Sequence, residues 1–506
     1  MFIRKLKNRS GTVSIQIISK AAKKYRVVKT IGCGKTLQEI ELLYQRARQE
    51  LFLLQGQQSL FISQEEAQIE SYLQTLSNAQ VQVMGPEIVF GKIYDHIGFS
   101  AIQEEMFRHL VITRLFHPGS KLKTIDYLLR YQSIHKTSDE IYRFLDKLQG
   151  GLKQQVEDIS FTHTLKLLKG KISVVFYDMT TLYFEAADED DLRKTGFSKD
   201  GKHQHPQIFL GLLVAIDGYA IGYDIFEGNI FEGHTLIPTL QKFEKRFNLS
   251  KPIVVADAGL LSKANITLLE RYQYPYILGA RIKNEAEPIR MQLQSVKWKE
   301  GKHITIKKQA RKLIVAYSEK RALKDEHNRK RGLQRLEKNL KAGRLTKSHI
   351  NNKGYNKYLK LIGELKVEID HNKFEQDKKW DGLKGYITNA PLRAEKIIDN
   401  YKQLWQIEKA FRISKTDLEI RPVYHRLRHR IEAHICIAFT AYCIYKELER
   451  VLKKEKSHLS VKRAAELTHT MYQLQIILPN TKEQKKILLK MTDDQTHLHE
   501  IILQNF

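Results

Sequence analysis

Three carboxylates stand in sequence contexts that suit metal-assisted chemistry. Asp178 follows the apolar run 172–177 and Asp257 follows the apolar run 252–256, so each is expected where a β-strand ends. Strand ends at one edge of an α/β sheet are where such folds bind ligands. Glu408 lies in a stretch with helical periodicity and supplies a third acid. Together the three oxygen donors predict a site for two hard cations, Mg²⁺ or Mn²⁺.

The chemistry of such a site is phosphodiester cleavage and strand joining. Two divalent ions about 3.5–4 Å apart activate a water or a 3′-hydroxyl and stabilise the leaving oxygen. Each acid also has a structural reading, because an Asp after a strand often caps a turn and a lone helical Glu is often a solvated charge. The prediction therefore depends on all three carboxylates meeting, and without metal their mutual repulsion would destabilise the site.

A single helix is predicted to carry Glu408. It is expected to start near Pro391, since proline is favoured in the first turn of a helix. Tyr401, Glu408 and Lys415 are seven residues apart. Seven residues fall only about 20° short of two full turns, so these side chains are expected on one helix face. Arg412 shares that face, and the two cations are expected to offset the charge of a scissile phosphate.

The overall charge points to a polyanionic partner. Among 506 residues, 85 Lys and Arg face 57 Asp and Glu, which leaves a net charge of +28. Such a charge favours binding to phosphate polymers through counterion release, so DNA is the expected ligand class. The excess of positive charge is especially strong in residues 301–350, which contain 16 basic and 4 acidic residues. We expect this stretch to contact DNA as well.

Export and membrane insertion are not predicted. Cys33, Cys436 and Cys443 form no CxxC pair, which fits a reducing cytoplasm. The longest mostly apolar run, 435–445, is too short to cross a bilayer. We therefore expect a cytoplasmic, nucleoid-associated bacterial protein without a membrane partner.

The elements around the acids predict an α/β fold. Asp217-Gly218, which lies between two apolar runs, is a strong signal for a β-hairpin. The later alternation of strand and helix signals indicates parallel strands joined by helices. The predicted order is strand 172–177, strand 208–216, strand 219–226, helix 235–247, strand 252–256, helix 262–272 and strand 276–278. This order is expected of a ribonuclease H-like α/β layer.

The chain is expected to contain several structural units, because 506 residues are too many for one ordinary core. The predicted units are a basic β-rich arm plus helix (1–62), a helical region (63–165), the first part of the ribonuclease H-like core (166–282), an inserted basic, partly β subdomain (283–389), the second part of the core with the Glu408 helix (390–453) and a helical tail (454–506). The region 63–165 is read either as a DNA-binding region or as a helical support for the core.

Two other motifs could bind a metal ion or a phosphate group. His203, His205 and His234 could bind zinc, but the sequence around the first two suggests a loop beside the carboxylates. Residues 32–36 resemble the end of a phosphate-binding loop, yet Lys29 stands where the first glycine belongs. ATP binding is therefore not predicted.

Each of the three tryptophans has two possible roles or placements. Trp298 and Trp380 lie among lysines in the inserted region, where a ring could stack on an unpaired base. Packing in a local core is the other reading of each. Trp405 is expected in the core or beside the site.

In combination, these motifs resemble a known group: the DDE transposases of bacterial insertion sequences that carry a Tyr-x2-Arg-x3-Glu-x6-Lys signature. Here the signature reads Tyr401-x2-Leu404-x3-Glu408-x6-Lys415, so Leu404 stands in the arginine position. Further resemblance lies in the segments 177–181, 196–200, 228–229 with Thr235, 256–262 and 421–425. The resemblance covers about residues 85–450.

The resemblance implies a ribonuclease H-like catalytic domain interrupted by an insertion, with Asp178, Asp257 and Glu408 as the metal ligands. It also implies that Tyr401 and Lys415 contact the phosphates of the transposon ends. The full set of predicted DNA-binding residues is Tyr401, Lys415, Arg412, Lys199 and Trp298.

For function, the resemblance implies a Mg²⁺-dependent transposase that cleaves the transposon ends and joins them to target DNA. Its partners would be the terminal inverted repeats, the target DNA and a second copy of the chain, as a homodimer on DNA. Leu404 leaves open whether excision passes through a DNA hairpin. The alternative is a catalytically inactive DNA-binding relative that acts as a repressor or a host-adapted protein, and an RNA-processing nuclease is a third reading.

Overall fold

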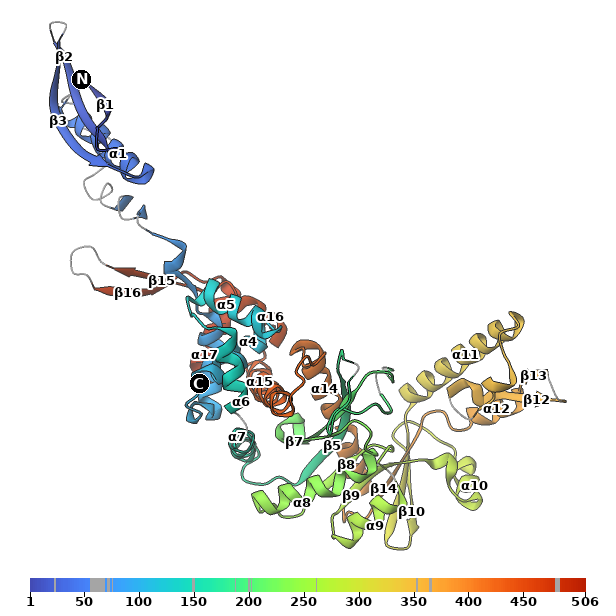
Figure 1. The fold of residues 1–506 in the computed structure, drawn as a ribbon. Coiled ribbons are helices and arrows are strands. Elements are labelled where there is room, and N and C mark those ends of the chain that lie inside the picture. Colours follow the sequence, from blue (N-terminus) through green and yellow to red (C-terminus); the bar gives the residue numbers. More distant parts are fainter. Residues whose placement is uncertain are drawn as a thin grey trace. The chain divides into compact units, whose positions relative to one another are not determined.

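The computed structural model of the protein contains two compact units, Met1–Gln80 and Val81–Phe506 (Figure 1). It describes residues 1–21, 24–54, 69–70, 73–74, 76–147, 151–186, 188–198, 201, 203–260, 262–351, 354–363, 366–477 and 483–506. Within these ranges, none of the helices combines the length and the apolar character that crossing a membrane requires.

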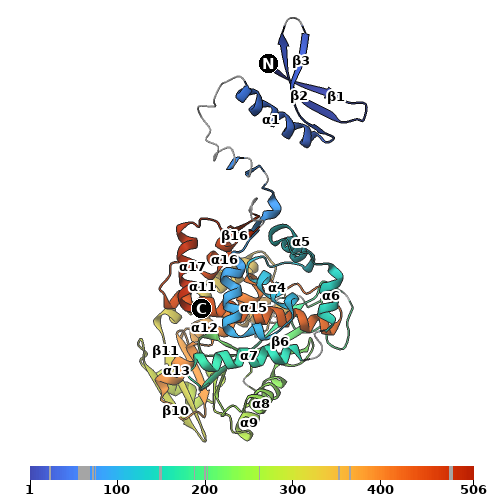
Figure 2. The same cartoon turned by 90° about the vertical axis from the view of Figure 1, so that its left-hand side faces the viewer.

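The first unit is a three-stranded antiparallel sheet with a helix against it (Figure 2). Its strands β1 (Phe2–Lys7), β2 (Val13–Ala21) and β3 (Lys24–Gly34) pair in the order β1-β2-β3. The helix α1 (Leu37–Leu54) covers one face, where Ile15, Ile17 and Ala47 are fully buried. Alternate residues of β2 point to the helix, as strand geometry requires. The predicted β-rich segment followed by a helix is confirmed.

The second unit is built on an eight-stranded mixed sheet in the order β10-β11-β14-β9-β8-β5-β6-β7. In one half, β5, β8 and β9 run parallel, whereas β6 runs antiparallel to both of its neighbours. Asp217 and Gly218 have positive φ, 61° and 81°, in the turn between β6 and β7. The predicted hairpin and the α/β class are therefore confirmed. This half comprises β5 (Val174–Tyr183), β6 (Gln207–Ala215), β7 (Ala220–Glu227), β8 (Ile253–Ala256) and β9 (Tyr276–Ala280).

The inserted region extends the same sheet. β14 (Leu383–Thr388) pairs antiparallel with β9, β11 (Arg311–Tyr317) pairs with β14, and β10 (His303–Lys308) pairs with β11. This pairing satisfies the backbone groups that an edge strand β9 would otherwise present to solvent. A second part of the insertion has its own small core, which includes Leu336 and Phe374. That part consists of α11 (Glu319–Lys341), β12 (Leu359–Ile362), β13 (Lys366–Ile369) and α12 (His371–Lys378).

Helices bury both faces of the sheet. Val175 and Tyr177 of β5 pack in the cluster that includes α8 and α9, whereas Phe176 packs on the opposite face in the cluster that includes α13, α14 and α15. Burial on two sides explains why these strands read as continuous apolar runs. The covering helices are α8 (Leu236–Phe247), α9 (Lys263–Arg271), α13 (Ala394–Lys402), α14 (Trp405–Arg412) and α15 (Arg428–Lys454).

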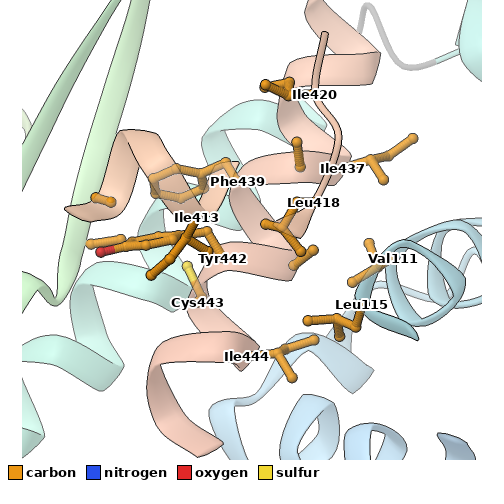
Figure 3. Close-up of a cluster of buried hydrophobic side chains, with 14 of the residues drawn as sticks. Val111, Leu115, Ile413, Leu418, Ile420, Ile437, Phe439, Tyr442, Cys443 and Ile444 are labelled. Atoms are coloured by element: carbon orange, nitrogen blue, oxygen red, sulfur yellow. The ribbon is translucent and has the colours of Figure 1, made fainter. Parts of the chain in front are cut away.

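The helix α15 joins the helices before the sheet to the segment after Glu408. In Figure 3, Val111 and Leu115 lie beside Ile444 of α15, and Ile413 lies beside Tyr442. The segment that follows Glu408 is thereby fixed in a buried apolar cluster. The helices before the sheet are α3 (Lys92–Ile97), α4 (Glu105–Phe116), α5 (Lys121–Gln132), α6 (Ser138–Lys147) and α7 (Leu152–Leu167).

The C-terminal tail differs from its prediction as a purely helical segment. Between α16 (Val461–Thr468) and α17 (Asp493–Asn505) the chain forms the antiparallel strands β15 (Tyr472–Ile477) and β16 (Gln484–Leu488). β15 also pairs with β4 (Val81–Val83), which lies almost 400 residues earlier in the chain. A strand that depends on so distant a partner leaves only a weak local signal, so the helical prediction for this part was wrong.

Candidate active site

The two aspartates lie on neighbouring parallel strands. Val174 of β5 is in register with Ile253 of β8, and Phe176 is in register with Val255. The pairing ends there; continued for two more residues, the same register would set Asp178 beside Asp257, at the usual strand separation of about 4.8 Å. The expected strand end at Asp178 was wrong, because β5 continues to Tyr183 while β8 ends at Ala256. Asp257 therefore leaves the sheet where Asp178 stays in it.

Asp257 also shapes the turn that follows β8. Its Oδ1 accepts hydrogen bonds from the backbone N–H of Gly259 at 2.8 Å and of Leu260 at 3.3 Å. Arg281, the residue after β9, donates to the carbonyl oxygen of Ala258 at 3.1 Å and so helps to hold the turn in place. Both of the bonds that Asp257 accepts use its Oδ1, so a turn-capping role and a metal-binding role are compatible at this residue.

The helix that carries Glu408 is not the continuous helix that was predicted. α13 ends at Lys402, α14 begins at Trp405, and a π-helical turn follows at Ile413–Asp417. At the junction, Leu404 N–H donates to the Tyr401 carbonyl and Ile407 N–H donates to the Leu404 carbonyl, each three residues back. Hydrophobic periodicity misses this break because the junction residues keep right-handed helical dihedrals.

Tyr401 and Glu408 nevertheless line one cleft together with Asp257. The cleft has a volume of about 780 Å³. Its walls come from the turn after β8, from the inserted region and from α13 with α14. Five carboxylates line it against three Lys or Arg side chains, so the charge of the lining favours cations. The charged lining residues are Asp257, Glu300, Glu395, Asp399, Glu408, Arg321, Lys384 and Lys402.

Tyr401 is buried against the strand that follows the Asp257 turn. A Cβ atom placed on Gly279 of β9 would lie 2.5 Å from the Tyr401 hydroxyl and 3.2 Å from the Ala258 nitrogen. The ring packs edge-on against Tyr386, with 4.9 Å between the centroids. Burial, followed by the charge of Asp257, raises the pKa of the Tyr401 hydroxyl. Tyr401 thus supports the turn that holds Asp257.

Lys384 is a site residue that the sequence did not reveal. It lies half-buried on β14, and its Nζ sits 5.1 Å from the centroid of the Tyr401 ring. Burial, followed by the charge of Arg321, lowers the pKa of Lys384, while Asp257 and Glu408 oppose this shift. Lys384 thus lines the cleft together with two of the predicted acids. The signal available in the sequence was the spacing of Lys384 and Tyr386, which are two residues apart and so lie on the same face of one strand.

The sequence profile described as "Transposase DDE domain" matches residues 169–444, more than half of the chain. This chain belongs to the DDE transposase family. The matched stretch contains Asp178, Asp257 and Glu408, so the three acids lie within the family's defining domain. The resemblance to transposases of insertion sequences is thereby confirmed.

Individual members of the DDE transposase family match a shorter stretch. The transposase for insertion sequence element IS231E of Bacillus thuringiensis subsp. finitimus is 32% identical over 127 residues, which are 23% of this chain and 27% of that protein. The transposase for IS231B of B. thuringiensis subsp. berliner is 30% identical over 129 residues, which are 24% and 27% of the two chains. The chain thus spans about a quarter of the length of the relatives it matches.

Solved transposase structures are similar only at a low level. The piggyBac transposase synaptic complex with hairpin DNA has a TM-score of 0.39 and 9% identity, over 76% of this chain and 78% of that chain. The Mos1 transposase paired-end complex with the left transposon end has a TM-score of 0.16 and 10% identity, over 34% and 58% of the two chains.

The remaining predicted DNA contacts of this DDE transposase have different placements. Trp298 lies in a small core of the insertion, where its indole N–H donates to the Leu293 carbonyl at 3.0 Å. Packing in a local core, the second interpretation of Trp298, is therefore confirmed. Arg412 is exposed at the end of α14, and Lys415 lies on the π-helical turn. Lys199 is outside the described residues. DNA contacts by these four side chains stay predictions.

Trp405 and Trp380 complete the set of tryptophans. Trp405 is 50% exposed and lines the cleft next to Leu404, so it lies beside the site, one of the two expected places. Trp380 packs in the same small core as Trp298. Leu404, which stands in the arginine position of the signature, is buried and contributes an apolar side chain to the cleft wall.

The acids of the site have the donor chemistry that Mg²⁺ or Mn²⁺ requires. Asp257 and Glu408 open onto one cleft, and Asp178 lies one strand away. Carboxylate oxygens suit hard divalent cations, so these residues fit the ions that the family chemistry implies. Among the residues that the structure describes, no three His, Cys, Asp or Glu side chains converge closely enough to hold one ion, and this includes Asp178, Asp257 and Glu408. His203, His205 and His234 accordingly form no such group.

Proposed function

We propose that this chain is a metal-dependent DNA transposase that cleaves the ends of an insertion sequence and joins them to target DNA. Its catalytic core would be ribonuclease H-like, with Asp178, Asp257 and Glu408 as the metal ligands. The observation that carries the proposal is the shared cleft of Asp257 and Glu408, with Asp178 on β5, the strand that pairs with β8. The printed names of the relatives, transposases for insertion sequence elements, agree with this function.

Two Mg²⁺ or Mn²⁺ ions, when bound, would supply an activated water or 3′-hydroxyl and stabilisation of the leaving oxygen. The chain's own residues prepare the cleft for this chemistry. The turn after β8 holds Asp257, and Tyr401 of α13 packs next to that turn. Glu408 is presented by α14, which contacts β5, the strand of Asp178. These contacts support a site that draws its three acids from distant segments of the chain.

DNA is the proposed substrate on grounds of charge. The net charge of +28 favours phosphate polymers, and the acidic cleft is bordered by Arg321, Lys384 and Lys402. Cations at the border of an acidic cleft attract the phosphate backbone while the acids stay available to metal ions. We propose that the terminal inverted repeats and target DNA bind here, with two copies of the chain pairing two ends.

Removal of divalent metal is expected to abolish cleavage and to leave DNA binding in place. The assay incubates the full chain with a duplex taken from the DNA that flanks the coding region, first with EDTA and then with Mg²⁺ or Mn²⁺ restored. Nicks at the element boundary should return with the metal because the carboxylates act only through it. Binding without nicking in Mn²⁺ would favour the inactive DNA-binding reading, and equal activity on an RNA duplex would favour a nuclease.

Lys384→Met is expected to slow cleavage by about tenfold, which corresponds to about 1.4 kcal/mol of transition-state stabilisation. The half-buried ammonium group would act on the scissile phosphate through a low local dielectric, which strengthens charge interactions. Lys384→Arg should retain most activity because it keeps the charge. Cleavage rates at saturating protein measure the effect.

The matched control for this prediction is Lys402→Met, because Lys402 lines the same cleft but is exposed and faces Asp399 at 3.4 Å. It should change the rate by less than threefold, as exposed ion pairs contribute little. Equal effects of the two Met variants would show that the position of the charge beside Asp257 and Glu408 is unimportant.

A further inference from the structure

The β2–β3 hairpin of the first unit extends beyond its third strand. β1 pairs with β2 only from Val13 to Ile18, whereas β2 and β3 stay paired as far as Ala21 and Lys24. The hairpin end, here defined as residues 19–21 and 24–26, is therefore a two-stranded β-ribbon (Figure 1). A ribbon of this kind has both faces available for contact.

The helix of the unit packs elsewhere on the sheet. Its apolar contacts are with Ile3, Val13, Ile15, Ile17 and Ile31. On the ribbon, Tyr25 is 60% exposed, and Val27 and Val28, which follow the ribbon on β3, are also exposed. Tyr25 is steadied by an edge-on contact with Phe2 and by the ammonium group of Lys20, 5.7 Å from its ring centroid.

Charge is distributed unevenly in this unit. Residues 1–35 contain ten Lys or Arg and no Asp or Glu. On the ribbon, Lys20, Lys24 and Arg26 are all exposed. The acids of α1 are engaged away from it: Glu39 accepts from the backbone of Lys35 and Thr36 at its own helix start, and Glu50 pairs with Lys29 at 2.7 Å.

We propose that this ribbon is a DNA-binding element that enters the major groove of duplex DNA, an inference that rests on the proposed transposase function. The major groove, about 12 Å wide, admits a two-stranded β-ribbon. A ribbon with cations on both strands and no acid places positive charge against both phosphate backbones at once. An apolar protein partner would not require this charge, and it would gain nothing from the absence of acids over 35 residues.

The test uses the full chain and the double variant Lys20→Ala/Arg26→Ala. Its matched control is Arg46→Ala/Arg48→Ala, which removes two exposed cations from α1 in the same unit. Fluorescence anisotropy measures binding to a duplex from the flanking DNA over a series of salt concentrations. The ribbon variant should bind at least tenfold more weakly and lose about two from the slope of log affinity against log salt, because two phosphate contacts are removed. The control should lose less than threefold.

Three outcomes would overturn the inference: equal losses in the two variants, unchanged binding by the ribbon variant, or a change in the mass of the DNA-free protein by light scattering. The last result would identify the ribbon as an interface between protein chains. Failure of the transposase proposal is distinguishable, since it concerns cleavage. The ribbon variant should still nick DNA at saturating protein, whereas a variant at Asp257 should bind DNA and fail to nick it.

Discussion

Asp257→Asn is expected to lower the rate of DNA-end cleavage on the order of 10³-fold while DNA affinity changes less than threefold. Loss of one anionic ligand removes several kcal/mol of charge stabilisation from the transition state, and each 1.4 kcal/mol corresponds to about tenfold in rate. Asparagine still accepts the hydrogen bonds of Gly259 and Leu260, so the turn should keep its shape. Single-turnover cleavage at saturating protein measures the chemical step.

The matched control is Asp399→Asn. Asp399 lines the same cleft from α13, is exposed, and pairs only loosely with Lys402 at 3.4 Å. Its loss removes the same charge from the same cleft and should cost less than threefold in rate. If Asp257→Asn cleaves at the rate of the control, Asp257 is not a metal ligand and the proposed site is wrong.

Gly279→Ala is expected to destabilise the second unit by about 2 kcal/mol, the usual scale of an overpacked core. The added methyl group would lie 2.5 Å from the Tyr401 hydroxyl and 3.2 Å from the Ala258 nitrogen. Either Tyr401 or the Asp257 turn must move, so cleavage should fall together with the apparent melting temperature. Thermal unfolding of the full chain, followed by the cleavage assay, measures both effects.

Tyr401→Phe provides the rescue for this substitution. Without the hydroxyl, the nearest atom of the ring lies 3.3 Å from the new methyl group, a contact that a small shift can accommodate. The double variant Gly279→Ala/Tyr401→Phe should therefore melt close to Tyr401→Phe alone. A double variant as unstable as Gly279→Ala would show that the Tyr401 hydroxyl does not lie over Gly279. Residues in contact are where such non-additive effects are expected.

The strands and helices around the acids could be predicted because local signals and tertiary packing agree there. The run before Asp257 is apolar since β8 is buried on both faces, and Ser262 caps α9 by accepting from the Asn265 N–H at 3.0 Å. Asp217-Gly218 adopts the positive φ that its hairpin turn needs. In each case, the residue type is fixed by a requirement within a few positions of the chain.

The predictions that failed depend on partners far away in sequence. β5 runs past Asp178 because β6 offers it a long antiparallel partner down to Tyr183. The break between α13 and α14 changes the hydrogen-bond ladder without interrupting the apolar pattern that periodicity detects. Strand β15 exists beside β4, whose sequence is almost 400 residues away.

Sequence patterns indicated the acids of the candidate site but not the residues that surround them. Asp257 and Glu408 could be found because strand ends and helical repeats mark them. Lys384 lies on β14 and Gly279 on β9, and these strands become neighbours only in the folded sheet. No local sequence pattern indicates that pairing. The parallel arrangement of β5 and β8 was likewise assumed from the sequence, and the folded sheet confirms it as far as Phe176 and Val255.

The continuity of the sheet across the inserted region limits how this gene can be shortened. β14 covers the edge of β9 and brings Lys384 to the cleft, while Arg321 comes from the start of α11. A copy lacking residues 283–389 would keep all three acids but lose one wall of the cleft and expose a bare strand to other chains. Deletion of residues 283–389 should therefore inactivate this protein through aggregation even though the codons of all three acids survive.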